Sequence, residues 1–266
     1  MEAGLDPERA PQTWDELVHF GQKLTVRDAS GQTKQWGVSM WSTFRDWWFS
    51  ALVLQNGGNL ITPDGRPRFN DPATIGAAQF LVDLVNKYQI MPPRPAGGKA
   101  TPQFLSQTAA MLYDSTGSLA FIQKSASFRW GTAFLPRGKQ EAVPVGGGNI
   151  WIFRNIPKEN QEAAWAFVKY MTGSEPAARW SVGTGYVAVN KKSWDLPVMQ
   201  AEMQKVPQLS VAREQLKYAH PRWATLSFGE VQRVLNNRLE DAIDQTLTPK
   251  QAMEQAQAEA DRLLKR

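Results

Sequence analysis

The chain has 266 residues, 30 Lys and Arg against 25 Asp and Glu, no Cys and 11 Trp, which suits one large or two ordinary domains. With 42% hydrophobic and 21% charged residues it is not a disordered chain, and no apolar stretch approaches the ~18–20 residues of a membrane-spanning helix. The net charge of +5 is scattered rather than gathered into basic patches, which disfavours a nucleic-acid partner, and the lack of Cys excludes disulfides, thiolate nucleophiles and Cys-ligated zinc.

Helix-start signals appear early in the chain. Thr13, followed three residues later by Glu16, forms a capping box that predicts the start of a helix. Residues 36–41 resemble a short strand that ends in aromatic and polar residues. Asp46 is then expected to cap a helix that stops at the Asn-Gly-Gly run 56–58, where glycines supply positive φ at low steric cost.

Further along, helices alternate with strands. Asp71 before Pro72 predicts the N-terminus of a third helix, and apolar spacing over 164–171 predicts another, closed by Gly173. Strand-like composition occurs at 109–113, 130–135, 150–153 and 186–189. Such alternation predicts the α/β class with substantial parallel sheet.

The C-terminal third is predicted to be helical. Apolar residues over 231–243 follow the i, i+3, i+4 spacing of an amphipathic helix. Thr248 with Gln251 forms a second capping box, which opens a last helix.

Motifs for catalysis or metal binding are scarce. His19 and His220 lack metal-ligand spacing, and neighbouring carboxylates at 15–16 and 240–241 point in different directions on a helix. The glycine cluster 146–148 has neither the Lys-Ser/Thr of a phosphate-binding loop nor dinucleotide spacing, so it fits a tight turn or a close approach to a ligand equally well. We therefore expect no catalytic residue, no metal and no cofactor.

The Trp content is the most informative part of the composition. Trp41 ends a predicted strand and is followed by Ser42 and Thr43. Ligands of open α/β sheets bind at the carboxyl ends of strands, and an aromatic face with nearby hydroxyls suits sugars and polyols. Core packing is an equally good interpretation of Trp41.

Several phrases resemble one family, and in chain order they are Ala3-Gly4-Leu5-Asp6-Pro7-Glu8, Pro11-Gln12-Thr13-Trp14-Asp15-Glu16-Leu17, Asn56-Gly57-Gly58, Asp114-Ser115-Thr116-Gly117-Ser118-Leu119, Gly146-Gly147-Gly148-Asn149-Ile150-Trp151, residues 163–172, Thr184-Gly185-Tyr186 and residues 247–252. Together they resemble the extracellular solute-binding proteins of ABC importers, of the maltose-binding-protein type, over essentially the whole chain. The glycerol-3-phosphate-binding branch is similar in its Ser-x-Gly-Ser-Leu, Gly-Gly, Thr-Gly-Tyr and Arg-Val phrases.

This resemblance implies an α/β, periplasmic-binding-protein type II-like bilobal fold, with most of the first lobe missing. Residues 11–146 and 200–266 are then expected to form the C-terminal (second) lobe, 147–199 the returning segment of the N-terminal lobe, and 1–10 a crossover remnant. The returning segment is expected to leave unpaired strand edges and an exposed apolar face. The family is periplasmic or extracytoplasmic, although the start of this chain does not resemble a signal peptide.

The same resemblance implies five ligand-binding residues: Trp41, Ser115, Gly147, Tyr186 and Arg233. Ser115 is expected to offer its hydroxyl, Gly147 its backbone amide and Tyr186 its phenol. Arg233 is expected to hold a phosphate, because a guanidinium grips oxyanions in two-pronged fashion. Trp41 is expected to stack on the ligand, and an alignment shifted by a few residues places Phe44 there instead.

The function implied is the substrate-binding component of an ABC importer. It would capture a sugar or glycerol-phosphate-type solute (glycerol-3-phosphate or a glycerophosphodiester favoured) in an interlobe cleft by hinge closure, and deliver it to permease subunits without chemistry. A glycan-acting hydrolase is the main alternative, but it needs two facing carboxylates and the ligand phrases offer only Asp114. A third hypothesis is a truncated, non-functional fragment.

Overall fold

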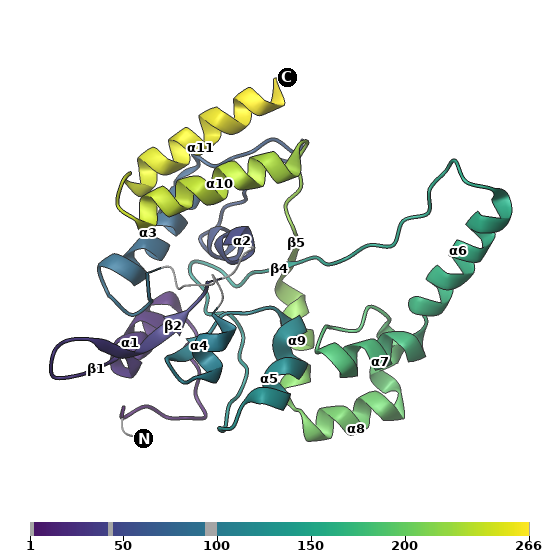
Figure 1. Cartoon of the computed structure of the whole chain (residues 1–266), viewed down its shortest axis with the longest axis horizontal. Coiled ribbons are helices and arrows are strands. Elements are labelled where there is room, and N and C mark those ends of the chain that lie inside the picture. Colours follow the sequence, from purple (N-terminus) through teal and green to yellow (C-terminus); the bar gives the residue numbers. More distant parts are fainter. Residues whose placement is uncertain (1–2, 42–44, 94–99, 266) are drawn as a thin grey trace. The chain divides into compact units, whose positions relative to one another are not determined.

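The chain folds into two units in a computed structural model that describes residues 3–41, 45–93 and 100–265. Unit 1 comprises Met1–Asp114, Leu135–Val145 and Tyr218–Arg266, and unit 2 comprises Ser115–Phe134 and Gly146–Lys217. Both units are therefore built from separate stretches of sequence (Figure 1). The predicted lobe boundaries, 11–146 with 200–266 against 147–199, stay a prediction; the two units group 115–134 and 200–217 with 146–199.

Unit 1 holds five short strands and six helices among its described residues. They are α1 (Trp14–Leu24), β1 (Val26–Arg27), β2 (Thr33–Ser39), α2 (Arg45–Gln55), α3 (Pro72–Asn86), α4 (Thr101–Leu105), β3 (Ala109–Leu112), β4 (Val143–Val145), β5 (Ala219–Pro221), α10 (Phe228–Ile243) and α11 (Pro249–Leu264).

Parallel pairing occurs in both sheets of unit 1. β2 pairs with β3 in parallel, with Trp36 opposite Ala109, and β1 adds an antiparallel edge. β4 and β5 form a second parallel pair, with Val143 opposite Ala219. The predicted α/β class is confirmed, although the strands that the structure describes are short.

Helix starts follow the predicted capping signals in three places. The Thr13 hydroxyl accepts the Glu16 N–H, and the Asp71 carboxylate accepts the Ala73 N–H. Thr248 forms a full capping box with Gln251 at the start of α11. Each such cap satisfies backbone donors that have no partner within the helix, typically contributing about 1 kcal/mol.

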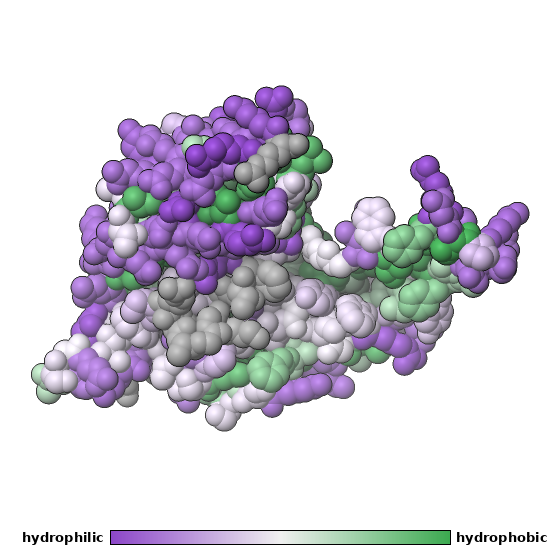
Figure 2. Space-filling view, turned by 45° about the horizontal axis from the view of Figure 1, so that its top comes forward, coloured by the Kyte–Doolittle hydropathy of each residue, from purple (hydrophilic) through white to green (hydrophobic). Residues whose placement is uncertain are grey.

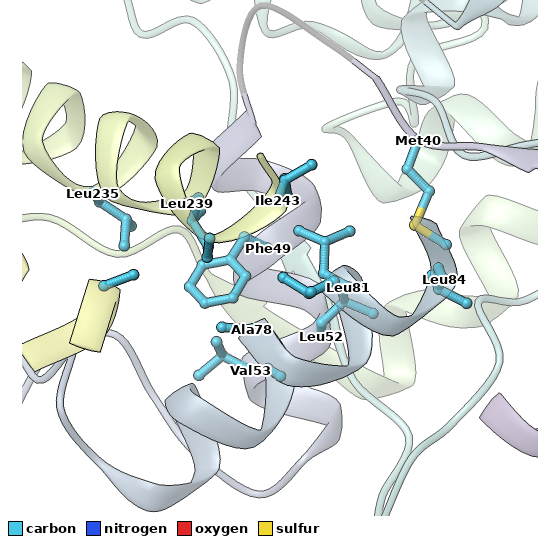
Figure 3. Close-up of a cluster of buried hydrophobic side chains, with 14 of the residues drawn as sticks. Met40, Phe49, Leu52, Val53, Ala78, Leu81, Leu84, Leu235, Leu239 and Ile243 are labelled. Carbon is cyan, nitrogen blue, oxygen red and sulfur yellow. The ribbon is translucent and has the colours of Figure 1, made fainter. Parts of the chain in front are cut away.

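The core of unit 1 lies between α2, α3 and the hairpin of α10 and α11 (Figures 1 and 3). Its buried side chains repeat at the helical spacing that the sequence predicted for α10. Figure 3 labels Met40, Phe49, Leu52, Val53, Ala78, Leu81, Leu84, Leu235, Leu239 and Ile243. Burial of a side chain of this kind contributes about 1.5–3 kcal/mol relative to exposure.

Asp46 does not cap α2 as predicted. It lies inside the first turn of that helix, is fully buried, and accepts hydrogen bonds from Arg222 Nη2, Trp223 Nε1 and the Gln232 amide. The prediction was wrong because tertiary partners, 176 or more residues away in sequence, hold this carboxylate.

Unit 2 is helical in the residues that the structure describes. Its elements are η1 (Thr116–Ser118), α5 (Leu119–Ser125), α6 (Lys158–Met171), α7 (Ser174–Thr184), η2 (Lys191–Asp195), α8 (Pro197–Lys205) and α9 (Gln208–Gln215), followed by η3 (Leu216–Tyr218) at its end. Two small apolar clusters hold it together, one around Trp194 and Met199 and one around Leu119, Val206 and Leu209.

Three predicted strands are absent from unit 2 as described, and each has a local reason. The segment 130–132 is tied to α9 by Gln208 and Thr132 rather than to a strand. At the start of the segment 186–189, the Tyr186 carbonyl accepts a hydrogen bond from the Ser181 hydroxyl rather than from a neighbouring strand. Residues 150–153 are irregular and pair with no strand in the described chain, and a strand needs a partner for its backbone groups.

Large apolar side chains of unit 2 lie at the surface. Trp151 is 79% and Phe153 76% exposed, and α6 has no buried residue although its sequence is amphipathic. Figure 2 shows this apolar character over the α6 part of the unit. An exposed apolar face is what the sequence led us to expect of this segment.

Candidate functional site

Ser115 begins a tight turn at the N-terminal end of unit 2. It is the N-cap of η1, and its Oγ accepts the Gly117 N–H at 3.2 Å while its carbonyl accepts the Ser118 N–H at 3.0 Å. The Asp114-Ser115-Thr116-Gly117 phrase folds this way because a Ser hydroxyl satisfies a donor that the short helix leaves open.

Tyr186 follows the C-terminus of α7. Gly185 ends that helix with φ +91°, a left-handed conformation that glycine adopts without strain, and its N–H donates to the Ser181 carbonyl at 2.7 Å. The Tyr186 carbonyl accepts from the buried Ser181 hydroxyl at 2.6 Å, and its N–H donates to Thr184 Oγ1 at 3.2 Å. Both backbone groups of Tyr186 are therefore fixed, while its side chain is 42% exposed.

These two turns pack directly against each other in unit 2. A Cβ placed on Gly117 lies 2.4 Å from Tyr186 Cζ and 2.7 Å from its hydroxyl oxygen. A Cβ placed on Gly185 lies 2.6 Å from the Thr116 carbonyl oxygen and 2.4 Å from Leu119 Cβ. The structure thus brings together the segments of two predicted ligand residues, Ser115 and Tyr186, which are 71 positions apart in the sequence (186 minus 115).

Gly147 lies in the irregular stretch that follows β4. It is exposed, and a Cβ built on it meets no heavy atom within 4 Å. No described contact ties Gly147 to the Ser115 and Tyr186 turns. Its predicted amide contact with a ligand stays a prediction.

Trp41 and Arg233 belong to unit 1 and have opposite surroundings. Trp41 is 5% exposed, and its indole N–H donates to the Pro92 carbonyl at 2.8 Å. Its burial and this contact make Trp41 a core residue, so stacking on a ligand would require the ring to leave the core. Phe44, the alternative position, lies outside the described residues.

Arg233 is on the solvent-facing side of α10. It is exposed, and no carboxylate within the described ranges forms an ion pair with it. Its neighbour Gln232 donates to the buried Asp46 carboxylate at 2.7 Å, which anchors this turn of the helix. Arg233 is therefore a cation on a fixed backbone with its guanidinium free to meet an anion.

Other ionisable groups of the described chain add no reactive centre. Burial raises the pKa of the Tyr113 phenol, which therefore stays neutral. No three His, Asp or Glu side chains gather into a possible metal site among residues 3–41, 45–93 and 100–265. None of the helices described there is long and apolar enough to cross a bilayer.

Sequence reasoning missed the part that two glycines play in this site. Gly117 and Gly185 stand inside the phrases that carried the family resemblance, yet nothing in the chain order shows that one turn rests on the other. The usable signal was a glycine beside each candidate ligand residue, since glycine often marks a close approach of two segments.

A model of the family described as bacterial extracellular solute-binding protein matches residues 2–209. The chain belongs to this family. The proteins of this family are described as solute-binding proteins, which favours solute binding over the alternative of a glycan hydrolase.

Curated relatives extend the match along the whole chain. The sn-glycerol-3-phosphate-binding periplasmic protein UgpB of Yersinia pestis bv. Antiqua is 29% identical over 277 aligned residues, covering 99% of this chain and 62% of that protein. The protein of the same name from Escherichia coli O6:K15:H31 is 28% identical and is covered to 63%. The chain therefore spans about three fifths of the length of these relatives.

Solved structures show the same fold. UgpB from Mycobacterium tuberculosis, in complex with glycerophosphocholine, superposes with a TM-score of 0.85 at 24% identity, covering 99% of this chain and 66% of that chain. The cyclic alpha-maltosyl-1,6-maltose binding protein from Arthrobacter globiformis gives 0.81 at 25% identity, with 99% and 67% covered. The expected solute-binding-protein fold is confirmed over that part of its length.

Proposed function

We propose that this chain is the substrate-binding component of an ABC importer and that its solute is a glycerol phosphate or glycerophosphodiester. The solute is captured by hinge closure of two lobes, and no bond is made or broken. The family match supports the general role, and the relatives named for sn-glycerol-3-phosphate support the solute class.

The observation that carries the solute class is Arg233 on α10, an exposed cation without an ion pair among the described residues. A phosphate monoester or diester is an oxyanion, and a guanidinium offers it two parallel donors. A neutral sugar has no charge to pair with such a group.

Three groups of unit 2 are assigned to the glycerol part of the solute. In the proposal the Ser115 hydroxyl, the Gly147 amide and the Tyr186 phenol make its hydrogen bonds. Tyr186 suits this task because its backbone is fixed and its phenol is partly exposed. Trp41 has no part in the proposal, because its ring is packed in the core of unit 1.

The partners and location of the protein follow from the same proposal. The matched relatives are described as periplasmic, and we infer an extracytoplasmic location and delivery to importer permease subunits.

Calorimetric titration of the purified protein with sn-glycerol-3-phosphate, glycerophosphocholine and maltose tests the proposal. We expect the two phosphorylated solutes to bind and Arg233→Ala to weaken them by roughly 10- to 100-fold, since a hydrogen bond to a charged group is worth about 1.5–3 kcal/mol. Arg262→Ala is the matched control, because Arg262 is an exposed arginine on α11.

Binding of maltose alone would overturn the assignment of a phosphorylated solute and would favour a neutral sugar. Equal affinities of the wild type and Arg233→Ala for sn-glycerol-3-phosphate would show that Arg233 is not the phosphate group's partner. A wild type that binds none of the three would contradict the proposal for this chain.

A further inference from the structure

Gly117 and the Tyr186 ring occupy adjacent space with no room for another atom. A Cβ added to Gly117 would lie 2.4 Å from Tyr186 Cζ, 2.7 Å from Cε2 and 2.7 Å from the hydroxyl oxygen. Real Cβ atoms essentially never approach other heavy atoms within 3.0 Å. The phenol end of Tyr186 therefore rests on the bare α-carbon of Gly117.

Two hydrogen bonds hold the backbone of Tyr186 in place. Its carbonyl is held by the Ser181 hydroxyl, and its N–H by Thr184. The preceding Gly185 lies close to the Thr116 carbonyl and to Leu119 Cβ, so the turn cannot move further toward η1 and α5. Rotation of the Tyr186 side chain is then the least costly way to accommodate an atom added at Gly117, because that atom would meet the far end of this side chain.

Gly117 needs no special backbone conformation. Its φ is not in the left-handed region, so an alanine there is compatible with the backbone of η1. The atom that a new Cβ would meet is the far end of a partly exposed side chain rather than buried backbone. Substitution should thus displace the phenol at small cost to folding.

We propose that Gly117 is a specificity-determining positioning residue, which sets where the Tyr186 phenol meets the solute by leaving the space of a Cβ empty. The inference rests on the proposed function, in which the Tyr186 phenol bonds to the solute. Gly117 itself is assigned no contact with the solute. It acts through Tyr186, and an alanine at 117 would move the phenol by about the size of a methyl group.

The contact itself is tested without any ligand by ¹⁹F NMR of protein labelled with 3-fluorotyrosine. The chain has five tyrosines, and the Tyr186 signal is assigned by its loss in Tyr186→Phe. We expect Gly117→Ala to shift the Tyr186 signal and leave the other four in place. Gly131→Ala is the matched control in the same unit, because a Cβ there meets nothing within 4 Å.

The consequence for binding is tested by titration with sn-glycerol-3-phosphate. We expect Gly117→Ala to weaken binding about tenfold, the effect of one lost hydrogen bond, with a melting temperature close to that of the wild type. In a Tyr186→Ala background the space is vacated, so adding Gly117→Ala should change the affinity less than twofold. A merely structural role of Gly117 would give the same loss in both backgrounds.

Two results would overturn the proposal: an unshifted Tyr186 signal in Gly117→Ala, or an affinity loss that persists unchanged without the Tyr186 ring. Should the wild type bind no solute, the proposed function fails, and the specificity role of Gly117 fails with it. A shifted Tyr186 signal would in that case still establish the contact, so the two failures are distinguishable.

Discussion

Asp46 and Arg222, 176 positions apart, are joined by a hydrogen bond of 3.0 Å from Arg222 Nη2 to the buried carboxylate of Asp46. The guanidinium also lies 4.5 Å from the centre of the Trp47 ring and 4.9 Å from that of Phe228. Trp223 and Gln232 complete the donors to the carboxylate. One buried anion thus ties α2 to the chain before α10 and to α10 itself.

Asp46→Ala should strongly destabilise unit 1. Removing one partner of a buried pair leaves a cation and two donors without their acceptor, which typically costs about 3–5 kcal/mol. Urea unfolding followed by circular dichroism measures the loss as a lower midpoint. Glu254→Gln is the control, because it breaks an exposed pair with Lys250 and should cost about 0.5 kcal/mol or less. Equal midpoints for the two variants would contradict a central role for Asp46.

Protonation of Glu16 at low pH should lower the stability of the fold. Its carboxylate accepts the Gln12 N–H at 2.7 Å and pairs with Arg9, and these two contacts lower the pKa of Glu16. A carboxyl whose pKa is lower in the folded state stabilises the fold above its unfolded pKa of about 4.3, and this stabilisation is lost as pH falls through the folded pKa.

Glu16→Gln checks this pH dependence, since the amide keeps an acceptor for Gln12 but loses the charge. The melting temperature of the wild type should exceed that of the variant near pH 7, and the gap should narrow by about pH 3. Arg9→Gln, which removes only one of the two contacts, should show an intermediate gap. A gap of the same size at both pH values would show that ionisation of Glu16 contributes nothing.

The tryptophans should differ in reactivity according to their exposure. Trp151 and Trp180 are 79% and 57% exposed, whereas Trp194 and Trp223 are each 4% exposed. Brief treatment with N-bromosuccinimide, followed by peptide mass mapping, should oxidise the first pair before the second. Urea-unfolded protein is the control, in which all four should react at similar rates. Protection of Trp151 in the native protein would show that another surface covers the 150–153 segment.

The sequence alone predicted the elements whose signals are local. Thr13, Asp71 and Thr248 begin helices because a side chain next to the helix start satisfies its open backbone donors, whatever the rest of the chain does. The α10 helix followed from apolar spacing alone. Strands were predicted less well, because 150–153 has strand composition but, in the part of the chain that the structure describes, no strand beside it to accept its hydrogen bonds.

Only the tertiary structure decided which residues meet. Asp46 resembled a helix cap in sequence, but partners from distant segments hold it in the core. Trp41 resembled a ligand platform, but its burial and its bond to Pro92 are properties of packing that no spacing reveals. The phrases that resemble the family indicated both Ser115 and Tyr186 as ligand-binding residues. The contact between Gly117 and the Tyr186 ring is long-range, since it depends on two turns from separate stretches folding against each other.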